Sequence, residues 1–100
     1  MTKHQKKVLN GLMHQVVRIR DGDECLKDDC HKTEALHLSH IFPVGGYRGL
    51  EFNIDNVKLL CYKHHIHWWH KNPPEAAIWL ADTIPKARLK RLFALANTTI

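Results

Sequence analysis

Two closely spaced pairs of potential metal ligands constrain the fold of this chain more than any other feature. The first pair is Cys25-x4-Cys30, and the second is Cys61-x2-His64. Two such pairs, each closing a short loop, suit a tetrahedral Zn²⁺ ion because they converge on it with little backbone strain. In a chain of only 100 residues, such an ion would supply folding energy that a small hydrophobic core cannot. The spacing therefore predicts a structural zinc site of three thiolates and one imidazole.

The sequence leaves two alternatives to this ligand set open. The three cysteines could instead be buried free thiols, and His31 or His65 could replace His64 as the fourth ligand. An odd number of cysteines argues against a disulfide framework. The basic N-terminus is not followed by a secretory apolar segment, and no run reaches the roughly 18 apolar residues that span a bilayer. We therefore expect a cytoplasmic protein with no membrane contact.

The charge balance favours a polyanionic partner. Lysine and arginine number 15 against 10 acidic residues, which gives a net charge of +5. Cationic side chains bind phosphate backbones and release counterions, so nucleic acid is the expected partner. We expect Arg48 in the glycine-rich loop, together with Lys63 and Lys71, to contact the phosphates. Nothing in the sequence indicates a base-reading helix or an oligomeric state.

The pattern of apolar residues predicts an α+β fold. Helical periodicity begins at Lys3 and continues to about Met13, and Val16–Arg20 either extends this helix or forms an extended lead-in. Strict alternation predicts a strand over Ala35–Ile41. Val57–Leu60 predicts a second strand, and a histidine-rich helix is expected directly after it.

Two more helices are predicted in the C-terminal third. Asn72 is the expected N-cap of the first, with Pro73 in its first position and Glu75 completing a capping box. Thr83–Pro85 starts the second. Its apolar stripe is expected to be buried and its basic face solvated; the stripe is Leu89, Leu92, Phe93 and Ala96, and the face is Lys86, Arg88, Lys90 and Arg91.

Three residues outside the predicted zinc site form a second pattern. His40 ends the first strand, Asn56 precedes the second, and His65 directly follows the last zinc ligand. Imidazole can take a proton from water near neutral pH, and a neutral imidazole can bind a divalent metal. The alternation of the strand is expected to aim His37 away from His40.

The stretch from Cys25 to Pro73 resembles an HNH endonuclease. The residues that carry the resemblance are "LSHIFPVGG", "FNIDNVKLLC" and "CYKHHIHWWHKNP", and the following "NPPEAAIWL" is similar to what often follows the motif in phage members. The resemblance implies a single nuclease domain over residues 1–100, with a motif core at about 25–73, and a bacterial or phage-infected cell as its setting. Its fold would be a ββα-metal (HNH) core stapled by a structural zinc, flanked by an N-terminal helix and two C-terminal helices.

The same resemblance implies a role for each residue of the second pattern. His40 would be the general base, Asn56 the asparagine of the motif, and His65 a ligand of the catalytic metal, with His70 as a second ligand. The catalytic ion would be Mg²⁺, Mn²⁺, Ni²⁺ or Zn²⁺, and the reaction the hydrolysis of a DNA phosphodiester bond. The alternatives are a non-catalytic, zinc-stapled module that binds nucleic acid and a zinc-stapled adaptor in a phage assembly.

The chain departs from the family pattern at two positions near these ligands. Ser39 stands where many members carry Asp or His as a second metal ligand. Trp69 stands where members often carry a further helix ligand, four residues after the first. On a regular α-helix His70 lies about 140° around from His65, given roughly 100° per residue. His70 would therefore reach a shared metal only if the helix starts late or ends early near Asn72.

Overall fold

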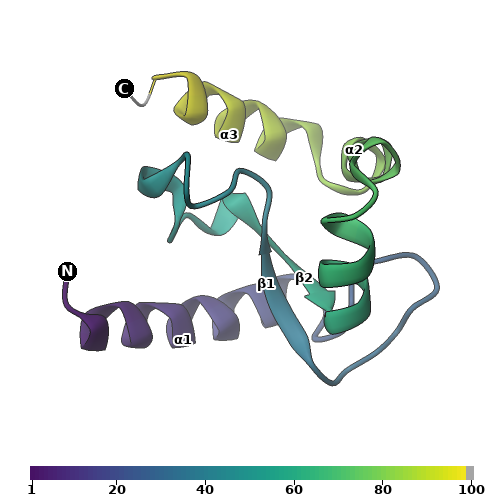
Figure 1. Ribbon diagram of the computed structural model, residues 1–100, viewed down its shortest axis with the longest axis horizontal. Coiled ribbons are helices and arrows are strands. Elements are labelled where there is room, and N and C mark those ends of the chain that lie inside the picture. Colours follow the sequence, from purple (N-terminus) through teal and green to yellow (C-terminus); the bar gives the residue numbers. More distant parts are fainter. Residues whose placement is uncertain (99–100) are drawn as a thin grey trace.

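The computed structural model describes residues 1–98 as an α+β structure. The elements in chain order are α1 (Lys3–Arg20), β1 (Leu36–His40), the short turns η1 (Arg48–Leu50) and η2 (Ile54–Asn56), β2 (Val57–Cys61), η3 (Lys63–Trp69), α2 (Pro73–Thr83) and α3 (Lys86–Thr98). β1 and β2 pair as a two-stranded antiparallel sheet, and together with the helices this confirms the predicted α+β class. α1 runs along one side of this sheet and α3 lies on the other (Figure 1). None of the helices in residues 1–98 has both the length and the apolar character needed to cross a bilayer.

The N-terminal helix is held to the sheet by its second half. A capping box at Thr2 starts α1, and Met13 and Val17 are its buried residues. Both pack on the sheet, whereas Val8 and Leu12 are 48% and 51% exposed. The helix therefore continues through Val16–Arg20, the segment that the sequence left open. Val17, which lies in this segment, is one of the two residues that anchor the helix.

The second strand is the centre of the molecule. All five residues of β2 are buried. One face of the strand packs against α1, and the other packs against α2 and α3. The antiparallel register pairs Val57 with His40 at one end of the sheet and Cys61 with Leu36 at the other. The sheet thus separates the predicted base from the predicted zinc ligands by its own length.

The start of α2 differs in detail from the prediction. Asn72 is the N-cap and Pro73 is the first residue, as expected. The predicted capping box is absent, because the Asn72 side chain donates to Glu75 Oε2 at 3.2 Å rather than accepting from the backbone. Glu75 Oε1 also accepts from Trp68 Nε1 at 3.0 Å. Glu75 therefore ties α2 to the end of η3.

The predicted faces of α3 are partly wrong. Leu89 and Leu92 are buried as expected, but Phe93 is 45% exposed. Arg88, assigned to the solvated face, is only 7% exposed. Its guanidinium donates to the backbone carbonyl of Val57 at 2.6 Å, so a buried carbonyl at the start of β2 draws the cation inward.

Candidate metal centre and histidine cluster

The four predicted zinc ligands come together from three parts of the chain. Cys25 and Cys30 belong to the loop between α1 and β1, Cys61 ends β2, and His64 lies in the first turn of η3. Their ligand atoms all lie within 4.8 Å of one another. These residues are therefore close enough to hold a metal ion, which is consistent with structural zinc.

The distances between the donor atoms match tetrahedral coordination. The Sγ atoms of Cys30 and Cys61 are 3.8 Å apart, and His64 Nδ1 lies 3.5 Å from Cys25 Sγ and 3.3 Å from Cys61 Sγ. Bonds of about 2.3 Å to sulfur and about 2.0 Å to nitrogen place tetrahedral donors roughly 3.5–3.8 Å apart. The alternative ligand His31 is exposed and bonds an acidic side chain instead. The donor set thus fits zinc.

The loop that carries the first cysteine pair has an unfavourable backbone. Four of its non-glycine residues have φ between 51° and 61°, namely Asp23, Asp29, His31 and Ala35. Each such residue costs about 1 kcal/mol or more. The loop is closed by a hydrogen bond of 2.8 Å from the Cys25 N–H to the Lys32 carbonyl. A metal bound to both cysteines would offset the cost of this conformation.

The pKa values of the residues in the cysteine–histidine cluster are shifted in different directions. Burial raises the pKa of the Cys25 thiol to about 12. Burial also acts to raise the pKa of Cys61, but hydrogen bonds from the His64 backbone and from the other two cysteines outweigh it and lower the value. Burial, followed by three nearby lysines, lowers the pKa of His64. The cluster therefore offers a neutral imidazole and an acidic thiol, whereas Cys25 gives up its proton only when a metal displaces it.

A π-helical turn brings His65 and His70 together. In η3 the N–H of His70 bonds the carbonyl of His65 at 3.3 Å, five residues back rather than four. The wider turn moves the two rings onto one face, and their Nε2 atoms are 3.1 Å apart. The angle expected for a regular α-helix is therefore wrong here, and His70 lies beside His65. Burial, then His70 and His37, lower the pKa of His65 to about 4, so its imidazole is neutral at pH 7.

His37 reaches the same histidine from the first strand. Its Nδ1 atom lies 2.9 Å from Nδ1 of His65. His40 lines a cavity with His65, and His37 is not among the residues that line it. Both histidines of β1 therefore lie near His65, His37 by direct contact and His40 across the cavity.

The predicted base lines this open cavity. His40, His65 and His70 contribute to its wall together with Trp69. His40 Nε2 lies 3.0 Å from the backbone carbonyl oxygen of Glu51. A carbonyl can only accept, so Nε2 carries the proton in this contact, and a neutral ring keeps a lone pair on Nδ1. The geometry suits a side chain that takes a proton.

Asn56 holds the glycine-rich loop and does not contact the cavity. The residue is fully buried. Its Oδ1 accepts from the Phe42 N–H at 2.8 Å, and its Nδ2 donates to the carbonyls of Phe42 and Leu50, each at 3.1 Å. Leu50 directly precedes the carbonyl that orients His40. Asn56 thus acts on His40 through the loop.

Ser39 is engaged by a lysine and is not free to act as a ligand. Its side chain is fully buried, and its hydroxyl oxygen lies 2.9 Å from Lys58 Nζ. The amine of Lys58 in turn lies over the ring of Trp69, 3.3 Å from its centre. The two positions where the family pattern carries further ligands are therefore occupied here by the buried Ser39 and the partly buried Trp69, and the buried Lys58 contacts both.

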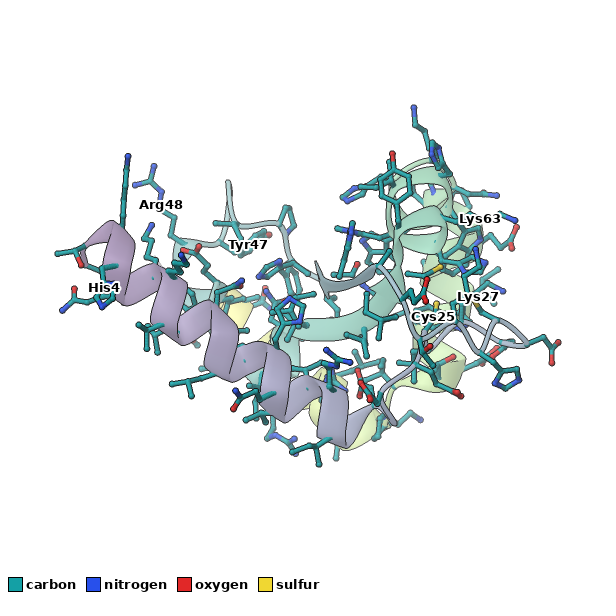
Figure 2. All side chains as sticks on the ribbon, turned by 90° about the horizontal axis from the view of Figure 1, so that it is seen from below. His4, Cys25, Lys27, Tyr47, Arg48 and Lys63 are labelled. Carbon is teal, nitrogen blue, oxygen red and sulfur yellow. The ribbon has the colours of Figure 1, made fainter. Side chains whose placement is uncertain are left out.

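The predicted phosphate contacts are exposed but lie in different places. Arg48, Lys63 and Lys71 all reach the surface. Arg48 lies near the N-terminal half of α1, whereas Lys63 lies beside Cys25 and Lys27 at the opposite end of the molecule (Figure 2). Arg48 and Lys63 therefore do not belong to one patch.

The sequence missed two residues of this region, His37 and Lys58. The crowding of histidines after His31 was a signal for the first. Lys58 gave no signal, because lysine is almost never fully buried and the strand pattern is read from apolar residues.

Comparison of the chain with protein-family models, with curated proteins and with solved structures finds no significant match. The features of the chain that indicate a function are the cysteine–histidine cluster and the histidine cluster.

Proposed function

We propose that this chain is a metal-dependent HNH endonuclease that hydrolyses DNA phosphodiester bonds. The observation that carries the proposal is the pair of Nε2 atoms of His65 and His70, 3.1 Å apart, in the cavity that His40 also lines. The order β1, β2, η3 is that of a ββα-metal core, with the cysteine cluster as its zinc staple. The net charge of +5 supports a phosphate-bearing substrate.

The donor pair fits a divalent ion. Two imidazole nitrogens bound at about 2.1 Å and close to a right angle lie roughly 3 Å apart. Nitrogen ligands of this kind accept Mn²⁺, Ni²⁺ or Zn²⁺, and Mg²⁺ would complete its shell with water and phosphate oxygens. Such an ion, when bound, stabilises negative charge on the scissile phosphate and the leaving oxygen.

The protein residues divide the remaining work. His65 and His70 hold the ion. His40 accepts the proton of the attacking water on Nδ1, since Nε2 is committed to the Glu51 carbonyl. Asn56 keeps that carbonyl in place through the loop. The exposed Arg48, Lys63 and Lys71 bind the phosphates on either side.

A plasmid-nicking assay tests the proposal. Zinc-loaded protein with added Mg²⁺, Mn²⁺ or Ni²⁺ should relax supercoiled DNA, and His40→Ala should lower the rate by roughly 10²–10⁴. His4→Ala is the matched control, because His4 is an exposed histidine on α1 far from Cys25 (Figure 2). Zinc content and DNA retention should be unchanged in both variants. Equal nicking by His40→Ala and the wild type would rule out His40 as the base.

One observation favours a second candidate, a zinc-stapled module that binds nucleic acid without cutting it. The buried Ser39 offers no ligand toward the histidine pair, so this strand position supplies no further protein ligand for a catalytic ion. Such a module would retard DNA in a gel in a salt-dependent manner. It would leave supercoiled plasmid intact with every metal tried.

A further inference from the structure

We infer that His37 is a positioning residue that fixes the tautomer of His65, so that His65 Nε2 presents a lone pair to the metal it shares with His70. The inference rests on the proposed metal pair and adds a residue to it. His37 is placed outside the ligand set, because its Nδ1 lies against Nδ1 of His65 and not against the Nε2 pair. It would act on the ion only through the ring of His65.

Both ring nitrogens of His65 are engaged. Nδ1 lies 2.9 Å from His37 Nδ1, and Nε2 lies 3.1 Å from His70 Nε2. A neutral imidazole carries one proton, so one nitrogen donates and the other keeps a lone pair. If the proton is on Nδ1 and points to His37, Nε2 is free to bind a metal. The two contacts are therefore coupled through one ring.

The acceptor on His37 is held in place from two sides. His37 packs edge-on against the ring of His65, with centroids 5.1 Å apart and an interplanar angle of 89°. On its other side it packs edge-on against Tyr62, at 5.8 Å and 77°. Its backbone is paired with Leu60 of the buried strand β2. A ring fixed by a sheet and two neighbours can set the orientation of a third.

Ser39, two residues further along the strand, cannot act as the acceptor for His65. Ser39 shares a strand face with His37 but is engaged by the Lys58 amine at 2.9 Å. Within β1 the hydrogen-bond contact to His65 is thus made by His37. A histidine that binds a metal generally donates its second N–H to a neighbouring acceptor, and loss of that acceptor weakens metal binding roughly 10- to 100-fold. His37 has the position and the chemistry of that acceptor.

Two variants of equal shape isolate the acceptor. His37→Asn keeps an oxygen near the position of Nδ1, whereas His37→Leu has nearly the same outline and no acceptor. Mn²⁺ is the probe, because it binds imidazole and oxygen but competes poorly for the thiolates of the zinc site. Binding is followed in zinc-loaded protein by the loss of the free Mn²⁺ electron paramagnetic resonance signal. We expect His37→Asn to bind within a few-fold of the wild type and His37→Leu to bind roughly 10- to 100-fold more weakly.

The tautomer is read separately, without Mn²⁺, by long-range ¹H–¹⁵N correlation of the His65 ring at pH 7. The wild type and His37→Asn should show the proton on Nδ1, and His37→Leu should shift it to Nε2. Zinc content and the thermal midpoint of each variant serve as folding controls. Equal Mn²⁺ affinity and equal tautomers in the Asn and Leu variants would overturn the role of His37 alone. If the wild type bound no Mn²⁺, and His65→Ala therefore gave the same binding curve as the wild type, the metal pair would be overturned and with it the proposed function.

Discussion

The Lys58 amine lies 2.9 Å from the hydroxyl oxygen of Ser39, with both residues fully buried. Nζ also contacts the Ser39 carbonyl at 3.3 Å and the face of the Trp69 ring. The contacts join β1, β2 and η3 at one point, directly behind the histidines. Burial, followed by the nearby Arg88, lowers the pKa of Lys58 well below its usual value. Burying the Lys58 amine therefore costs free energy when the amine is protonated, and this cost depends on pH.

We predict that Lys58→Met removes a pH dependence of stability. Between the lowered folded pKa and the unfolded value near 10.5, the unfolded chain binds one proton more than the native protein. The free energy of unfolding of the wild type should therefore rise with pH in this window, by at most about 1.4 kcal/mol per pH unit. Urea unfolding at several values from pH 7 to 10 measures the difference between wild type and variant.

The exposed Lys90→Met on α3 is the control, and its difference from the wild type should stay flat over the same range. A Lys58→Met curve parallel to that of the wild type would show that the buried amine stays protonated in the native protein and that the assigned direction is wrong.

Zinc binding should strengthen as pH rises. The burial that raises the pKa of Cys25 to about 12 keeps this thiol protonated in the metal-free protein, so zinc must displace a proton. Each proton displaced gives about a tenfold gain in apparent affinity per pH unit. Competition with a chelator at pH 6, 7 and 8 measures the slope. Calorimetry in two buffers of different ionisation enthalpy counts the protons, and a pH-independent affinity would contradict the assignment.

The sequence predicted the zinc ligands because their spacing alone restricts the geometry. Each short pair, Cys25 with Cys30 and Cys61 with His64, must fold back on itself whatever the rest of the chain does. Spacing did not settle the second cluster. The angle between His65 and His70 follows from the helix type, and the π-helical turn that sets it has no signature in the sequence.

For the helices and strands outside the two clusters, the sequence likewise predicted the local pattern but not the contacts made in the folded protein. Periodicity located both strands and the C-terminal helices to within a few residues. Periodicity did not predict that Lys58 and Arg88 are buried, because lysine and arginine normally mark solvated positions. Both are buried because each donates to backbone or hydroxyl oxygens that only the assembled fold brings near.

Asn56→Leu should destabilise the protein strongly. Leucine has almost the same shape but leaves the Phe42 N–H and the Phe42 carbonyl without their partner, while the Leu50 carbonyl keeps its bond from the Asn53 N–H. A buried group left unsatisfied costs about 1–3 kcal/mol, so we expect a loss of about 2 kcal/mol or more in urea unfolding. Asn53→Ala, which removes one bond to the Asp55 N–H at 2.9 Å, should cost only about 1 kcal/mol. Equal losses for the two variants would contradict a special role of Asn56 in the loop.

Arg20 and Arg88 should show cooperative losses, because both donate to one carbonyl. Nη2 of each lies 2.6 Å from the oxygen of Val57, and the two side chains come from α1 and α3 on opposite sides of β2. Replacing either one by Met leaves this buried carbonyl bonded by the other and also relieves the repulsion between the two cations. Replacing both leaves the carbonyl without a donor. The double variant should therefore lose about 1 kcal/mol or more beyond the sum of the single losses.

Arg91 provides the matched control for this cycle. It is an exposed arginine on α3 whose bond is to the Asp55 carboxylate and not to Val57. The losses for Arg20→Met and Arg91→Met should add within about 0.5 kcal/mol, since the two side chains share no acceptor. Urea unfolding of zinc-loaded protein gives all the free energies on one scale. Additive losses for Arg20 and Arg88 would mean that Val57 finds another donor, and that the two helices do not act on β2 through this carbonyl.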